Sequence, residues 1–438
     1  MIKKMMKKIA LMLVIISMFT SFLDRAFSQE RIDLDLTKII NMALSASEDY
    51  QINKNKIRIS ESKYQESKSA LYPHLNSTAT WCNNFKYPNN PLLLMGTYEV
   101  EGNINMSQLL YSFGRVSNAI KAAQKESTIS QLNKEAQELD VIFNAKVSYF
   151  AALLAEKSLI ILQESLNNSL RNKDILEQNS IDGRISKKDN IKISADISAR
   201  KPMVSNARAA RISAIKILKN IIGEEEGVEI KLIDRIEDRY AEEDRMFYIK
   251  AFEKNSPILK ALQESIYLTE HVIRIKKAEF RPLISLYASW TNVGVSKQAH
   301  IGRDNFNDYG VAGVAISFPI FNGGEKHQQL KQAKFDKKNA ELVYKKIQED
   351  LRLVLSIAIE ECREHKQTLL ADEESIQYAQ ESFLMHQDLL KAGKVTLTEV
   401  NDAELLLTRV KLNKEVTLFN INSTVARIEK LSTMEAMQ

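Results

Sequence analysis

The sequence SFPIFNGG at residues 317–324 joins a run of alternating residues to a long segment that has neither proline nor glycine. A looser copy, SQLLYSFG at residues 107–114, has the same kind of neighbours on both sides. Proline breaks a helix interior and glycine weakens it, so each copy predicts a passage from a strand into a long helix. The turn residues expected at these passages are Gly114, Pro319, Gly323 and Gly324.

Other landmarks repeat at nearly the same spacing. YPHL at 72–75 corresponds to RPLI at 281–284, an offset of 209 residues, and DGRIS at 182–186 corresponds to AGKVT at 392–396, an offset of 210. Solenoid repeats are about 20 to 50 residues long, so this period indicates duplication of a whole half-domain. We expect a first repeat at 29–222, a linker or equatorial segment at 223–245, where the composition changes, and a second repeat at 246–438.

The N-terminus has the features of a secretory signal peptide. Four lysines precede an apolar run from Ile9 to Phe22, and Ala26-Phe27-Ser28 supplies a small-x-small cleavage site before Gln29. The apolar run is shorter than the roughly 20 residues that span a bilayer, which disfavours a membrane anchor. We expect residues 1–28 to be removed.

Composition narrows the class of protein. Residues 1–28 hold five basic residues and one acidic residue, so their loss lowers the net charge from +5 to +1, which argues against a nucleic-acid partner. The remaining chain has no apolar run of 18 residues, so it predicts no transmembrane helix, and membrane insertion would require a closed β-barrel. The two cysteines, Cys82 and Cys362, are expected to be unbridged thiols.

Alternating apolar and polar residues predict strands at about 73–85, 98–111, 282–293 and 309–321. The alternation suits a barrel with lipid outside and water inside, although ordinary hairpins on a soluble core would also alternate. Four strands cannot close a membrane barrel, because the smallest single-chain barrels have about eight. A barrel therefore requires several copies of the chain.

Long helices are predicted at about 115–180, 187–222, 325–391 and 397–433. At about 1.5 Å per residue, the two longest would each reach roughly 100 Å, more than a globular domain needs. Along 340–362, apolar residues at spacings of three and four predict a coiled-coil seam. Glycines prefer the C′ position of a helix, so Gly183 and Gly393 predict the tips of two antiparallel helical hairpins.

These segments together resemble the TolC-type outer-membrane efflux channels over essentially the whole mature chain. The most specific match is GKVTLTEVNDA at 393–403, which is similar to the family's second helix-turn tip. The resemblance implies an α+β homotrimer, in which three chains form a twelve-stranded transmembrane β-barrel continued by a coiled-coil α-helical tunnel in the periplasm. It also implies a periplasmic adaptor protein, an inner-membrane pump of the RND, ABC or MFS type, and outer-membrane lipid as partners.

The resemblance further implies a constriction at the periplasmic entrance, at the positions of Glu399 and Asp402. Residues three apart share a helix face, so in a trimer they would form two rings of carboxylates. Alternatively, Glu399 is an acidic residue favoured in a first helical turn. We expect an adaptor protein to dock at the two hairpin tips, which comprise Gly183, Arg184, Ile185, Gly393, Lys394 and Val395.

The sequence contains no signature of an enzyme. HExxH, paired CxxC, G-x-S-x-G and phosphate-binding glycine loops are absent, and the six histidines are scattered, so we expect no catalytic residue, cofactor or metal site. The alternative from another class is a secreted periplasmic coiled-coil protein, a spacer or adaptor without channel activity.

Overall fold

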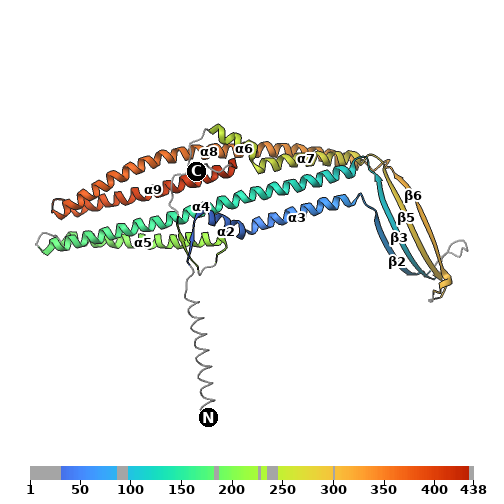
Figure 1. The fold of residues 1–438 in the computed structure, drawn as a ribbon, viewed down its shortest axis with the longest axis horizontal. Coiled ribbons are helices and arrows are strands. Elements are labelled where there is room, and N and C mark those ends of the chain that lie inside the picture. Colours follow the sequence, from blue (N-terminus) through green and yellow to red (C-terminus); the bar gives the residue numbers. More distant parts are fainter. Residues whose placement is uncertain are drawn as a thin grey trace, which may run out of the picture. The chain divides into compact units, whose positions relative to one another are not determined.

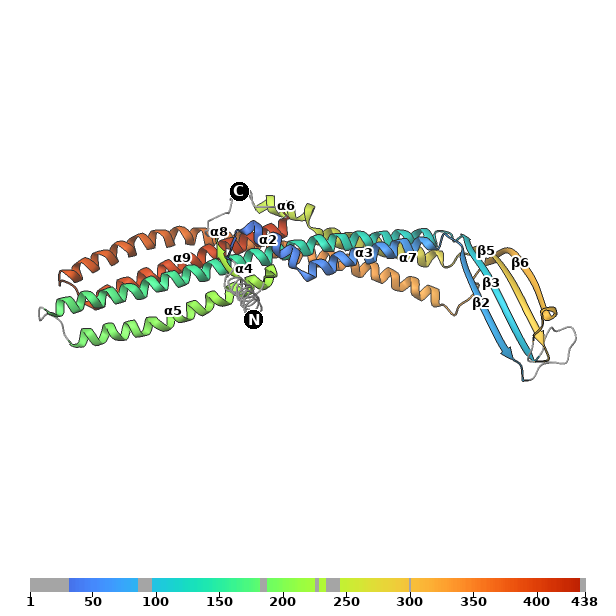
Figure 2. The ribbon, with the colours of Figure 1, turned by 60° about the horizontal axis from the view of Figure 1, so that its bottom comes forward.

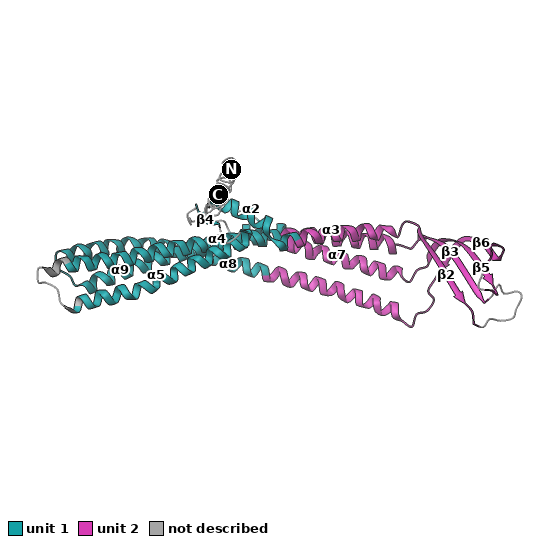
Figure 3. Ribbon diagram, turned by 90° about the horizontal axis from the view of Figure 1, so that it is seen from below, with its two compact units in different colours: residues 1–51, 137–256, 351–438 teal, residues 52–136, 257–350 magenta. Residues whose placement is uncertain are grey.

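A computed structural model describes residues 31–85, 97–181, 187–224, 228–233, 245–298 and 301–433. The chain divides into two compact units, each assembled from separate stretches of both sequence repeats (Figure 3). Unit 1 comprises residues 1–51, 137–256 and 351–438, and unit 2 comprises residues 52–136 and 257–350. The boundary between the units therefore cuts across both repeats.

Unit 2 contains a four-stranded antiparallel sheet with the order β2-β3-β5-β6 (Figure 1). Its strands are β2 (His74–Asn83), β3 (Tyr98–Tyr111), β5 (Leu283–Ser296) and β6 (Phe306–Ser317), the last preceded by a short 3₁₀ helix, η1 (Arg303–Asn305). The last strand begins and ends earlier than the expected 309–321. Pro319 has no backbone N–H for a ladder hydrogen bond, which accounts for the early end.

Helices connect to this sheet at both ends of each hairpin. They are α3 (Glu48–Ser69), α7 (Pro257–Ala278), α4 (Arg115–Ile181) and α8 (Glu325–Lys391). Unit 2 holds α7, α3 from Ile52 onward, and only the first parts of α4 and α8. Lys125 of α4 pairs with Glu264 of α7 at 2.6 Å, and Lys337 of α8 pairs with Glu270 of α7 at 2.9 Å. Ion pairs on both sides thus join α7 to its neighbours.

Unit 1 contains two helical hairpins that lie side by side (Figure 2). The second part of α4 runs beside α5 (Lys187–Ile222), and the second part of α8 runs beside α9 (Leu397–Ser432). An apolar cluster joins all four helices: Leu176, Ile193, Ile197, Ala379, Phe383, Leu390, Leu397, Val400, Ala403, Leu407 and Val410. Among the described residues, no helix has the length and apolarity needed to cross a bilayer.

Shorter elements complete unit 1. Strand β1 (Arg31–Leu34) pairs in parallel with β4 (Glu229–Leu232), and the helices are α2 (Leu36–Ala46) and α6 (Arg245–Asn255). Strand β4 lies within the segment expected as a linker, of which residues 225–227 and 234–244 are outside the described residues. Gly223 has a φ of +73°, and a side chain there would meet the Cβ of Ala46 at 2.7 Å. The end of α5 thus packs closely on α2.

The structure confirms the α+β class, with long helices and one sheet built from both repeats. The seam predicted along α8 is only partly buried in the single chain. Ala358 and Cys362 are fully buried, but Val343 and Val354 are 47% and 41% exposed, and Leu355 is buried instead. Helix α8 passes through both units, so its neighbouring helices differ along its length. The covered face of α8 therefore follows its neighbours in each unit and not a single heptad pattern.

Candidate functional site

The sheet has an apolar face and a polar face. One cross-strand row, Leu75–Met106–Ala288–Ala312, lies on the first face, and the next row, Asn76–Asn105–Ser289–Val311, lies on the second. On the polar face, Asn103 Nδ2 donates to Thr291 Oγ1 across β3 and β5 at 2.6 Å. Strand β6 is the exception, because Val311 makes it apolar on both faces, as its sequence indicates.

The two outer strands of this sheet, β2 and β6, each have one neighbour among the described residues. Such edges present unpaired N–H and C=O groups that can pair with another chain. All three pairings are antiparallel, and the number of strands is even, so β6 and β2 run in opposite directions. A second copy can therefore continue the sheet with the same antiparallel alternation.

Glycines shape the passages from strand to helix. Gly114 has a φ of +90°, and Gly323 and Gly324 have φ of +58° and +81°, conformations that glycine adopts without a steric penalty. Pro319 lies in the connection between β6 and α8. In the first repeat, Phe113 occupies the place of Gly323 and also has a positive φ, +48°. Its ring contacts Tyr111 edge-on, with the ring centroids 4.6 Å apart, which supports this strained residue.

The second hairpin tip is a Schellman turn. Gly393 N–H donates to Leu390 O and Lys394 N–H donates to Leu389 O, both at 2.9 Å, and the φ of Gly393 is +68°. Gly393 and Lys394 are exposed, whereas Val395 is half-buried against the apolar cluster of unit 1. Of the three tip residues, Val395 thus anchors the turn to the helices.

The first hairpin tip, with Gly183, Arg184 and Ile185, lies outside the described residues. Beyond it, Lys192 on α5 donates from Nζ to Thr398 Oγ1 on α9 at 2.5 Å. Lys192 occupies the position that corresponds to Asp402 in the second repeat. Its ammonium bonds to Thr398, one helical turn from Asp402, so a positive charge partly offsets the acidic one at this level of the hairpins.

Glu399 is held in the first turn of α9. Thr396 is the N-cap, and the Glu399 carboxylate accepts from the Thr396 backbone N–H at 2.7 Å and from its hydroxyl at 2.8 Å, which forms a capping box. These hydrogen bonds, the backbone one first, lower the pKa of Glu399 from its ordinary value of 4.5. The helix-turn interpretation of Glu399 therefore has direct geometric support.

Asp402 lies on the exposed side of α9, as does Glu399. Within the part of the chain that the structure describes, no hydrogen bond or ion pair engages the Asp402 carboxylate. The intervening residues Val400 and Asn401 face the interior of the unit. The two predicted constriction residues thus share one face of the helix, but only Asp402 has a carboxylate with no partner in that part of the chain.

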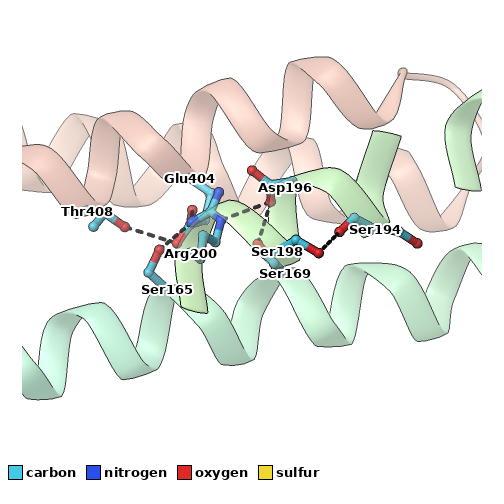
Figure 4. A network of polar contacts seen from close by, with 8 residues as sticks. All are labelled: Ser165, Ser169, Ser194, Asp196, Ser198, Arg200, Glu404 and Thr408. Carbon is cyan, nitrogen blue, oxygen red and sulfur yellow. Dashed lines mark hydrogen bonds and ion pairs between the residues drawn. The ribbon is translucent and has the colours of Figure 1, made fainter. Parts of the chain in front are cut away.

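A buried ionic network links three helices of unit 1, and nothing in the sequence analysis pointed to it (Figure 4). Arg200 of α5 bonds through Nη1 to Glu404 of α9 and to Ser165 of α4, and its Nε donates to Asp196 at 2.9 Å. Thr408 donates to Glu404 at 3.0 Å. The side chains of Arg200 and Glu404 are only 4% and 1% exposed, so the pair is removed from water.

Polar atoms near this network lack partners within the described structure. They are Arg200 Nη2, both side-chain polar atoms of Asn172, and Asn401 Oδ1. Asn172 follows Ser169, which donates to Asp196, by three residues on α4, and Asn401 precedes Glu404 by three residues on α9. A polar layer therefore interrupts the apolar interior of the four helices, beside the cluster that Ile193 and Val400 belong to.

Neither cysteine is in a disulfide bond, as the sequence predicted. Cys82 is half-buried in β2 and Cys362 is buried in α8. Within the described ranges, no group of three or more His, Cys, Asp or Glu residues could hold a metal ion.

The stabilising effect of the Glu399 carboxylate on the start of α9 depends on pH. Because the pKa of Glu399 is lowered in the folded chain, its stabilising effect is present above the unfolded pKa near 4.5 and is lost as the pH falls through the folded value. We expect Glu399→Gln to weaken amide-exchange protection of residues 397–400 at neutral pH, with no difference from wild type in strong acid.

Glu415 on the same helix is a control of opposite sign. Burial raises its pKa, so its ionisation opposes folding above pH 4.5, and Glu415→Gln should increase protection at neutral pH. Exchange measured as a function of pH would contradict the capping role if Glu399→Gln and wild type gave the same protection at neutral pH.

Comparison with known proteins identifies relatives over most of the chain. The family model described as outer membrane efflux protein matches residues 39–224 and 248–431, nearly the two sequence repeats. The outer membrane efflux protein BepC of Brucella suis biovar 1 (strain 1330) is 21% identical over 364 residues, 81% of this chain and 76% of BepC.

Solved structures share the fold. The CmeC outer membrane channel of Campylobacter jejuni has a TM-score of 0.78 at 15% identity, over 92% of this chain and 87% of CmeC. The open state of the MtrE outer membrane channel of Neisseria gonorrhoeae has a TM-score of 0.76 at 17% identity, over 92% of this chain and 89% of MtrE.

Proposed function

Because the chain belongs to the outer membrane efflux protein family, we propose that it forms the outer-membrane channel of a tripartite efflux or type I secretion system. Its sheet would lie in the outer membrane and its helices would extend into the periplasm. It would be a passive conduit and perform no chemistry. The observation that carries this proposal is a sheet with one apolar face, one polar face and two open edges.

The open edges favour self-association as a homotrimer. Four strands are fewer than the roughly eight needed to close a membrane barrel, whereas three copies would supply twelve. Large apolar side chains on the apolar face are uncovered in the single chain: Leu75 is 70% exposed, Trp290 57% and Ile316 70%. Lipid would cover these side chains, and the polar face would line a water-filled lumen.

The helices also need neighbours. Exposed apolar side chains lie along two helices, at Met203, Ile212 and Ile217 of α5 and at Leu353, Ile357, Leu370 and Tyr378 of α8. Extensive exposed apolar surface on a helix marks an interaction site. We propose that adjoining copies cover it, so that the helices of three chains form one coiled-coil tunnel.

The hairpin tips are the proposed contact for partners. A periplasmic adaptor protein would dock at Gly183, Arg184 and Ile185 and at the turn of Gly393, Lys394 and Val395, and the adaptor would connect to an inner-membrane pump of the RND, ABC or MFS type. The exposure of Gly393 and Lys394 supports a docking role for the second tip.

Glu399 and Asp402 would form the constriction at the periplasmic entrance. Threefold symmetry would turn each residue into a ring of three carboxylates, an arrangement that attracts cations. Since Glu399 is engaged by Thr396, we propose that Asp402 supplies most of the charge that faces the lumen. Opening would require partners to spread the hairpins at their tips.

Single-channel conductance of the purified mature protein in a planar bilayer tests this function. We expect discrete conductance from wild type and a several-fold larger conductance from the Glu399→Ala, Asp402→Ala double variant, because two rings of charge and side-chain bulk are removed. Asp402→Asn should give most of this rise and Glu399→Gln little.

Glu381→Ala is the matched control, because Glu381 is an exposed carboxylate on α8, and its conductance should equal wild type. If the double variant has the same conductance as wild type, the protein is a channel but Glu399 and Asp402 do not form its constriction. A folded protein without conductance would favour the periplasmic spacer instead.

A further inference from the structure

The exposed side of α9 is a single narrow stripe near the tip. Between Leu397 and Val416, its exposed residues are Glu399, Asp402, Leu405, Leu406, Arg409, Asn413 and Val416. At about 100° per residue, all of them fall within about 60° of the direction of Asp402. A trimer that directs Asp402 into the lumen would therefore direct the centre of this stripe there too.

Arg409 lies near the centre of the stripe. It is seven residues beyond Asp402, which places it only about 20° away around the helix and about 10 Å further along the axis. Within the described structure, its guanidinium has no acidic partner. The other cations of this stretch are paired: Lys411 with Glu164 of α4 at 3.2 Å, and Lys414 with Glu373 of α8 at 2.8 Å.

We propose that Arg409 is a second selectivity determinant of the channel, a ring of guanidinium groups about 10 Å deeper than the Asp402 carboxylates that acts against small inorganic cations. The inference rests on the proposed function, because only the assembled trimer turns the stripe into rings. Asp402 would draw cations to the entrance, and Arg409 would repel them one step further in.

At the level of Arg409, α9 carries a charge and the corresponding position of α5 does not. The residue of the first repeat that corresponds to Arg409 is Ala199, which is exposed and uncharged. The positive charge at this level would therefore come from α9 of each copy and not be cancelled by α5. At the acidic level, by contrast, Lys192 lies close to Asp402's own turn and reduces the field that a cation meets.

Ion selectivity of the reconstituted channel tests the assignment. The reversal potential of a potassium chloride gradient gives the ratio of potassium to chloride permeability. We expect Arg409→Gln to raise this ratio roughly threefold or more, and Asp402→Asn to lower it. Lys411→Gln is the matched control, because it removes one positive charge two residues away that already pairs with Glu164.

Chemical rescue separates charge from structure. Arg409→Cys should show the same rise in cation preference as Arg409→Gln, and a positively charged thiol reagent should return the ratio toward wild type. The same reagent on wild type controls for Cys82 and Cys362. Rescue is expected only if position 409 is open to water in the pore.

The outcomes separate the proposed channel function from the proposed role of Arg409. A wild-type protein that is folded but does not conduct overturns the proposed function. A wild type that conducts, with an Arg409→Gln variant indistinguishable from the Lys411→Gln variant, overturns the role of Arg409 and leaves the channel intact. A rise in the permeability ratio in both Arg409→Gln and Arg409→Cys, which the cationic reagent reverses in Arg409→Cys, supports both.

Discussion

Replacement of Glu404 by alanine is expected to destabilise the helical hairpins of unit 1 by about 3–5 kcal/mol. The change leaves the Arg200 guanidinium buried without its main counter-charge, while one of its nitrogens, Nη2, already lacks a partner in the described structure. Asp196 remains at 2.9 Å from Nε, but it also accepts from Ser169. The Asp196 side chain is 19% exposed, so its charge is partly screened by water and compensates the buried guanidinium less than that of Glu404.

Amide exchange measures this effect without requiring reversible unfolding of a membrane protein. A loss of this size should speed the exchange of protected amides in α5 and α9 about a hundredfold or more. Glu381→Ala, which removes an exposed carboxylate from α8, should change exchange little. Equal exchange in Glu404→Ala and Glu381→Ala would show that the ionic network does not hold the helices.

The double variant Arg200→Met, Glu404→Leu tests why the network is there. Replacement of a buried ion pair by apolar residues of similar volume is often neutral or stabilising. We therefore expect the double variant to recover most of the protection that Glu404→Ala loses. If protection recovers, the network serves to fix which helix faces meet, because apolar side chains alone would accept several registers.

The features that the sequence predicted well are local. Glycine turns at Gly324 and Gly393, a proline at 319 and a period of two in β3 each act through a few neighbouring residues. The structure has a positive φ at both glycines and a strand at Tyr98–Tyr111. The duplication adds independent evidence, because a weak signal such as Phe113-Gly114 is supported by Gly323-Gly324 in the second repeat.

The features that the sequence did not predict depend on packing between distant segments. Arg200 and Glu404 are 204 residues apart, and each looks like a solvated charge on a polar helix. Helix α3 has only a weak signal in the sequence, because Ser60 is the one residue of its 22 that is buried. Helix α7 does have a signal, with Pro257 at its start and Leu259 and Ile266 buried, but it lies outside the four long helices that the composition predicts.

Substitution of a single residue on the apolar face of the sheet should block membrane assembly. Ile104 lies on β3, between Ser77 and Trp290 in the neighbouring strands, and is 47% exposed in the single chain. If this face meets lipid, Ile104→Arg places a guanidinium in hydrocarbon at a cost of about 2–4 kcal/mol in each copy, depending on depth. The loss would be repeated in every copy of the assembly.

The next residue supplies the matched control. Asn105 points to the polar face, opposite Asn76 and Ser289, so Asn105→Arg adds the same charge to the same strand on the side of the lumen. We expect Asn105→Arg to insert into vesicles as wild type does and Ile104→Arg to remain unassembled, with heat-resistant trimer on gels as the measurement. Equal insertion of both variants would mean that the apolar face does not meet lipid, because a strand in a bilayer cannot accept a charge on both faces alike. That result would leave the fold intact and remove the strongest physical reason for placing this sheet in a membrane.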